Sequence, residues 1–159
     1  MIDSLCSFIH RMTPLEVVLV YRAYVESRVV SPELERRVCN FVRLRYNELN
    51  ASTALGLLFS YSRSIEHSHR PLQSDVVNLL SEEVHRCLTQ FSTRDLLYLV
   101  CAYNHLRLYP KDDIDAIAGK LVDQVYTFSP RESFYVLTCL NRSQYAVCIS
   151  FSVVIHPLQ

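Results

Sequence analysis

A chain of 159 residues has the length of one domain, and half of its residues are apolar or aromatic, which is enough for a continuous core. Its 16 basic and 16 acidic side chains cancel, which excludes an overall cationic field for non-specific nucleic-acid binding. The two glycines are too few for glycine-dependent hairpins or phosphate loops, and they favour helices bounded by proline and capping residues.

Four segments share one plan for a helix start: an apolar residue, a capping residue, and an acidic or hydroxyl residue three positions later. The cap accepts a free N–H of the first helical turn, and the third residue can bond back to the cap. The four predicted caps are Thr13, Asn50, Ser92 and Ser129. They lie 37, 42 and 37 residues apart, so one copy carries five additional residues.

Each cap begins what we call an A helix. Counted from the cap, the fifth, seventh, eighth and eleventh residues that follow it are apolar or aromatic. The tenth position is small and precedes a large side chain, which predicts close helix packing beside a core anchor. These anchors are Tyr24, Tyr61, Tyr103 and Leu140. Between the A helices, three prolines at intervals of 39 residues predict the starts of B helices. They are Pro32, Pro71, with a cap at Ser74–Asp75, and Pro110.

This pattern predicts an all-α fold, a right-handed α-α superhelix (solenoid) of helix-turn-helix repeats of about 37 residues. The repeat domain is residues 1–143: a B-type half-repeat at 1–12, repeats at 13–49, 50–91 and 92–128, and a half-repeat at 129–143. The tail, 144–159, is apolar and breaks the pattern, so we expect either a closing helix or a strand-like segment that docks on a partner. Its candidate docking residues are Val147, Ile149, Phe151, Val153, Val154 and Ile155.

Motifs for catalysis or metal binding are absent from the sequence, including nucleophile elbows, phosphate loops and zinc signatures. Glu66, His67 and His69 are too few for a metal site, and we expect a solvated loop there and no metal or cofactor. The adjacent carboxylates of Asp112–Asp113 suit the positive end of a helix rather than acid–base chemistry. The six cysteines form no CxxC pair and are expected as reduced core residues in a reducing compartment.

Basic side chains give the functional pattern, because equivalent residues of successive repeats form ladders on a solenoid surface. Arg63, His105 and Arg142 share the thirteenth position after a cap, and Arg94 and Arg131 share the second. Such ladders are suited to phosphates or RNA bases. The alternative is that they are ordinary solvated arginines or local salt bridges, because the net charge is zero and the first repeat breaks both ladders.

The unit Phe-Ser-Pro/Thr-Arg-Glu/Asp followed by a hydrophobic stretch, at Phe91–Tyr103 and Phe128–Leu140, resembles heptatricopeptide and octotricopeptide repeats. It is also similar to the helical region of Fas-activated serine/threonine kinase-like and RAP-domain proteins. The resemblance implies an organellar location and binding of mitochondrial or plastid RNA, including ribosomal RNA. The sequence has no RAP domain, and its array is short.

From this resemblance we expect a non-catalytic mitochondrial protein, a structural subunit of a mitochondrial ribosome that contacts rRNA and neighbouring proteins. The alternative is a protein–protein scaffold subunit of another large complex, without RNA contact. No apolar stretch reaches the roughly 20 residues of a membrane span, so neither a membrane span nor a small-molecule substrate is expected. Residues 1–12 contain Asp3 and are a poor mitochondrial presequence.

Overall fold

The computed structural model describes residues 8–29, 31–68 and 70–142, and in this part the chain is all-α, as predicted. The described residues form seven α-helices, four short 3₁₀ helices and no strand. The α-helices are α2 (Pro14–Glu26), α3 (Pro32–Arg45), α4 (Ala51–Ser68), α5 (Ser74–Arg86), α6 (Thr93–Leu106), α7 (Lys111–Leu121) and α8 (Pro130–Arg142). Most of the predicted helix at 1–12 and the whole tail 144–159, with its candidate docking residues, lie outside the described residues.

Each predicted A helix begins at its predicted cap, as α2, α4, α6 and α8. At all four starts the cap and the residue three positions later exchange hydrogen bonds. In α4, for example, the Thr53 N–H donates to Asn50 Oδ1 (3.0 Å) and the Asn50 N–H donates to Thr53 Oγ1 (2.9 Å). The other pairs are Thr13–Glu16, Ser92–Asp95 and Ser129–Glu132.

The start of α5 differs from the prediction of a Ser74–Asp75 cap. Gln73 occupies the cap position without a side-chain capping bond, and its N–H donates to the Tyr61 hydroxyl instead (3.0 Å). The Asp75 carboxylate pairs with Arg43 of α3 (2.6 Å). Asp75 is therefore used for a contact between helices α3 and α5 rather than for capping.

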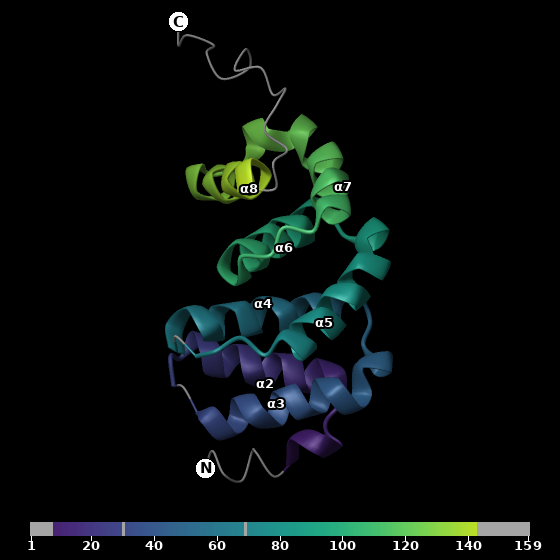
Figure 1. The fold of residues 1–159 in the computed structure, drawn as a ribbon, viewed down its shortest axis with the longest axis vertical. Helices are drawn as coiled ribbons and strands as arrows, with labels where there is room; N and C mark the ends of the chain where they lie inside the picture. Colours follow the sequence, from purple (N-terminus) through teal and green to yellow (C-terminus); the bar gives the residue numbers. More distant parts are fainter. Residues whose placement is uncertain (1–7, 30, 69, 143–159) are drawn as a thin grey trace, which may run out of the picture.

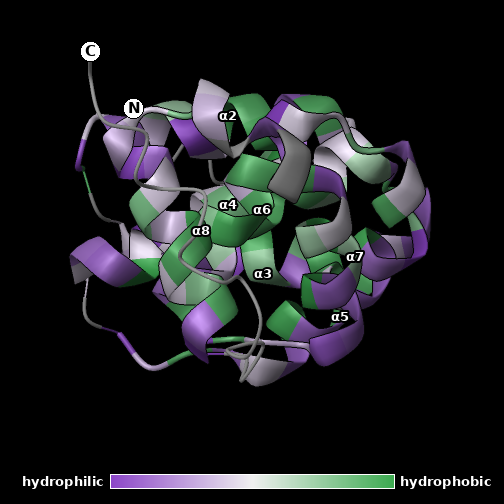
Figure 2. Ribbon diagram, turned by 90° about the horizontal axis from the view of Figure 1, so that it is seen from above, coloured by the Kyte–Doolittle hydropathy of each residue, from purple (hydrophilic) through white to green (hydrophobic). Residues whose placement is uncertain are grey.

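The A helices form one row, in which α2, α4, α6 and α8 each contact the next (Figure 1). The B helices α3, α5 and α7 pack beside the A helices that precede them. In a ribbon coloured by hydropathy, the hydrophobic residues are concentrated toward the interior of the stack (Figure 2). The predicted anchors Tyr61 and Tyr103 are fully buried. Tyr24 is only half-buried, and the neighbouring Tyr21 fills the core of the first repeat instead.

The five additional residues of the second repeat lengthen a helix rather than a loop. Helix α4 has 18 residues, whereas α2 and α8 have 13 each and α6 has 14. His67 therefore lies in the last turn of α4, which corrects the prediction of a solvated loop for this residue; His69 lies outside the described residues. Within the described ranges, no group of three or more metal-binding side chains occurs.

Helix α8 exposes apolar side chains at two positions that earlier A helices bury. Leu55 and Leu58 of α4 are 5% and 0% exposed, but the equivalent Phe134 and Leu137 of α8 are 65% and 55% exposed. In the described part of the chain no further A helix follows α8 to cover them. The apolar face of α8 is therefore partly exposed at these two residues.

Three of the six cysteines, Cys39, Cys87 and Cys139, are buried and unpaired, as predicted for core residues. Burial raises the pKa of the Cys39 and Cys139 thiols to about 12, so both remain protonated. Cys101 is also unpaired but only partly buried, and Cys6 and Cys148 lie outside the described residues. None of the described helices is long and apolar enough to cross a membrane.

Candidate functional site

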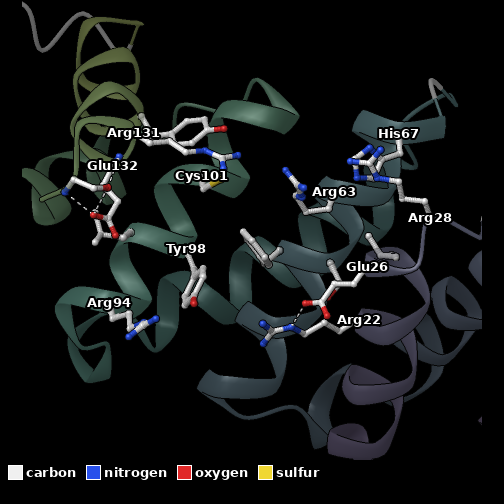
Figure 3. A pocket seen from close by; sticks show the side chains of 16 residues that line it. Arg22, Glu26, Arg28, Arg63, His67, Arg94, Tyr98, Cys101, Arg131 and Glu132 are labelled. Atoms are coloured by element: carbon white, nitrogen blue, oxygen red, sulfur yellow. Dashed lines mark hydrogen bonds and ion pairs between the residues drawn. The ribbon is translucent and has the colours of Figure 1, made fainter.

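A cleft of about 520 Å³ runs across the row of A helices and takes side chains from all four of them (Figure 3). It crosses the row obliquely. On α2 its lining residues come from the C-terminal half of the helix and on α8 from the N-terminal half, whereas on α4 and α6 they include the mid-helix residues Phe59 and Cys101. The ninth position after the cap, occupied by Arg22, Phe59 and Cys101, lines the cleft on three helices, and the remaining lining positions differ between the α2–α4 half and the α6–α8 half.

Basic side chains dominate the charge of the cleft. Five arginines line it and only two glutamates, Glu26 and Glu132. The arginines are Arg22, Arg28, Arg63, Arg94 and Arg131. Because the whole chain is neutral, this excess is a local property of the cleft and not a general field of the protein.

The carboxylates near the cleft are already engaged. Glu26 accepts from Arg22 (2.7 Å), and Glu66, beside the cleft on α4, accepts from Arg63 (3.0 Å). Glu132 accepts from the Ser129 N–H (2.7 Å) and hydroxyl (2.6 Å), and these bonds, with the nearby Arg94, lower its pKa.

Among the described residues, Arg28, Arg94 and Arg131 form no ion pair, so their charges remain available for an anionic ligand. The other two arginines that line the cleft, Arg22 and Arg63, each form an ion pair.

Three aromatic side chains form part of the wall between these arginines. Phe59 of α4 meets Tyr98 of α6 edge to face, with 5.1 Å between ring centroids. Tyr135 of α8 meets His105 in the same manner at 5.7 Å, and the Arg131 guanidinium lies over the Tyr135 ring at 5.8 Å. The cleft thus combines cations with aromatic rings, which is the combination found in sites for single-stranded nucleic acids.

The structure brings together three of the five residues predicted to bind RNA: Arg63, Arg94 and Arg131 line the cleft. His105 does not line it; its side chain is 8% exposed and lies 3.6 Å from Glu66, toward which Arg63 also points. Arg142 donates instead to the Tyr109 hydroxyl (3.0 Å). Arg63, His105 and Arg142 therefore do not form the common edge that was expected.

Sequence reasoning missed Arg22, Arg28, Phe59, Tyr98 and Tyr135. A signal was present for the two tyrosines, because each follows a predicted arginine by four residues and so shares its helix face. No comparable signal marks Arg28, which follows α2 with a left-handed backbone (φ 56°).

Two titratable groups beside the cleft have pKa values shifted by burial. Burial lowers the pKa of His105, against the influence of Glu66, so its imidazole is uncharged near neutral pH. Burial raises the pKa of the Cys101 thiol, which keeps it protonated and a poor nucleophile.

A second polar cluster connects the B helices away from the cleft. The buried Asp113 carboxylate of α7 accepts hydrogen bonds from the Tyr103 hydroxyl of α6 and pairs with His85 of α5. Burial, together with this carboxylate, raises the pKa of Tyr103 well above its usual value. Asp112 and Asp113 lie in the first turn of α7, as predicted, and Asp113 also connects three helices.

The bond to Asp113 raises the pKa of His85 above its ordinary value of 6.5. We expect the stabilisation from this pair to be complete below about pH 6.5 and to disappear as pH rises through the folded-state pKa. The effect is small, because the His85 side chain is 60% exposed and solvent screens the pair. Urea unfolding between pH 5.5 and 8.5 measures it.

A His85→Gln variant should lose this component of the pH dependence, whereas His10→Gln, which replaces an exposed histidine, should keep it. Equal pH profiles for His85→Gln and the unchanged chain would contradict the expectation.

No model of a known protein family, no curated protein and no solved structure matches this chain. The likeness of its repeat unit to heptatricopeptide-type repeats therefore stays a prediction from the sequence.

Proposed function

We propose that this chain is a non-catalytic helical-repeat protein that binds single-stranded RNA in the cleft across its A helices. In this proposal the helices form a right-handed α-α superhelix with a repeat of about 37 residues. The single observation that carries the proposal is the cleft itself, where three arginines that form no ion pair with any residue the structure describes adjoin aromatic side chains.

A single strand fits the cleft better than a duplex does. A volume of about 520 Å³ accommodates a few nucleotides and not a double helix. Aromatic rings can stack only on bases that are not already paired, and RNA-binding proteins recognise unpaired bases in this way. The neutral net charge restricts phosphate contacts to the cleft, so we expect modest affinity for long nucleic acids of any kind.

The resemblance to heptatricopeptide and octotricopeptide repeats supports a more specific form of the proposal. It suggests a mitochondrial protein that contacts rRNA as a structural subunit of a mitochondrial ribosome. The neutral charge is consistent with a subunit held by protein neighbours as well as by RNA.

The second candidate is a protein–protein scaffold, and the exposed Phe134 and Leu137 of α8 favour it. Two large apolar side chains next to each other on an outer helix are typical of a docking surface. A scaffold of this kind does not need the free arginines of the cleft. The absence of RNA binding would therefore favour this candidate over the first.

The affinity of the purified chain for a fluorescein-labelled single-stranded RNA tests the proposal. If Arg28, Arg94 and Arg131 neutralise three phosphates, a plot of log Kobs against log salt concentration should have a slope of about −2. Fluorescence anisotropy at 20 to 300 mM salt measures this slope. A slope near zero, or no binding at the lowest salt, would contradict RNA binding in the cleft.

A further inference from the structure

Helices α6 and α8 carry the same pair of residues in the cleft, an arginine followed four positions later by a tyrosine. The pairs are Arg94 with Tyr98 and Arg131 with Tyr135, and all four side chains line the cleft. Residues four apart lie on the same helix face, so each pair presents one cation and one ring side by side. Because α6 and α8 are in contact, the two pairs are adjacent.

The equivalent positions of α2 and α4 carry no such pair and do not line the cleft. The α4 residue equivalent to Tyr98 is Gly56, where an added Cβ would lie 2.8 Å from Val18 Cγ1 of α2. Helices α2 and α4 approach each other too closely there for any side chain, and an aromatic ring is excluded. The equivalent α2 residue is Leu19, which has neither charge nor an aromatic ring.

The two halves of the cleft also differ in whether their arginines form ion pairs. Arg22 of α2 pairs with Glu26, and Arg63 of α4 pairs with Glu66. Arg94 and Arg131 form no ion pair among the described residues, and the Glu132 carboxylate beside them is hydrogen-bonded to Ser129, so both guanidinium groups can bind phosphate. In the same part of the chain Arg28, at the opposite end of the cleft, also forms no ion pair.

The rings of Tyr98 and Tyr135 are held in place by neighbours that meet them at steep angles. The plane of Phe59 is inclined at 66° to Tyr98, and that of His105 at 89° to Tyr135. None of the aromatic neighbours, including Phe134 at 65° to Tyr135, is stacked parallel to a tyrosine, and the Arg131 guanidinium covers one face of the Tyr135 ring, so a base on Tyr135 must stack on the other face. Rings that are already ordered lose little conformational entropy when a base stacks on them.

We propose that the α6–α8 end of the cleft reads two consecutive nucleotides, with bases stacked on Tyr98 and Tyr135 and phosphates held by Arg94 and Arg131. This inference rests on the proposed RNA binding and adds where and how the strand is recognised. An acidic peptide could satisfy the two arginines, but it has no aromatic faces for the two tyrosines. The paired arrangement therefore favours nucleotides.

The test compares two labelled probes, octaadenylate RNA and an abasic ribose-phosphate oligomer of the same length. The unchanged chain should bind octaadenylate at least tenfold more tightly, because only this probe can stack. Tyr98→Leu/Tyr135→Leu should remove this preference, with a loss for octaadenylate that exceeds any loss for the abasic probe caused by the missing contact between Tyr135 and Arg131. Tyr98→Phe/Tyr135→Phe keeps both rings and should keep the preference, which separates stacking from a loss of folding.

A second pair of variants locates the phosphate contacts. Arg94→Gln/Arg131→Gln should weaken binding of both probes about tenfold, and Arg28→Gln, which breaks no ion pair among the described residues, less than about threefold. Equal losses for the two variants, equal binding of the two probes by the unchanged chain, or a preference that survives in the leucine variant would each overturn the inference. The inference would also be overturned if octaglutamate displaced the labelled probe as strongly as unlabelled octaadenylate does. A failure to bind either probe would instead reject the proposed RNA binding itself.

Discussion

Replacing Leu58 by alanine is expected to lower the free energy of unfolding by about 2–5 kcal/mol. Leu58 has no exposed surface and lies in the middle of α4, which contacts α2, α5 and α6. The removed methyl groups leave a cavity, because helices packed on several sides of α4 cannot all move inward to fill it. Urea unfolding followed by circular dichroism measures this loss.

Leu137→Ala is the matched control, because Leu137 occupies the same position in α8 but is 55% exposed. Alanine has a high helix propensity and removes little buried surface there, so we expect a cost below about 0.5 kcal/mol. A cost close to that of Leu58→Ala would show that another surface covers α8. That outcome would contradict the exposure of this helix face.

The helix starts could be predicted because their physical causes are local. A capping side chain and its partner are three residues apart, so the cap at Ser92 is readable without the rest of the fold. The apolar face of α6 follows in the same way from residues spaced along a single helix, and Leu96, Leu99 and Tyr103 are fully buried.

Features that depend on contacts between helices were not predictable. Asp75 and Asp113 both look like helix-start carboxylates in the sequence, but Asp75 pairs with Arg43 and Asp113 bonds Tyr103 and His85. These partners are about 10 to 32 residues away and become neighbours only in the folded chain. The length of α4 was missed for a related reason, since an insertion gives no local sign of whether it extends a helix or a loop.

The candidate site was predicted in part. Equivalent repeat positions correctly associated Arg94 with Arg131, but they also associated Arg63 with Arg142, which lies outside the cleft. The assumption of a straight ladder fails because the cleft crosses the helix row obliquely. The position of a groove on a helix stack depends on how each helix is displaced relative to the next, and repeat spacing alone does not contain this information.

Reversing the three cleft charges that have no ion pair should nearly abolish RNA binding. In Arg28→Glu/Arg94→Glu/Arg131→Glu, three attractions to phosphate are lost and three repulsions are added. At on the order of 0.5–1 kcal/mol for each of these changes, the total is about 3–6 kcal/mol, a loss of affinity of at least about a hundredfold. Anisotropy titration at 50 mM salt against one single-stranded RNA measures it.

Arg36→Glu/Arg37→Glu/Arg107→Glu gives the same net charge with all three changes outside the cleft. Arg107 matches Arg28 closely, since each follows an A helix with φ 56°, and Arg36 and Arg37 are exposed on α3. If RNA is bound through the cleft, this control should lose less than about tenfold, because its charges act only through screened, longer-range repulsion. Similar losses in the two variants would mean that overall charge rather than the cleft determines binding, and RNA recognition would have to be sought elsewhere on the chain.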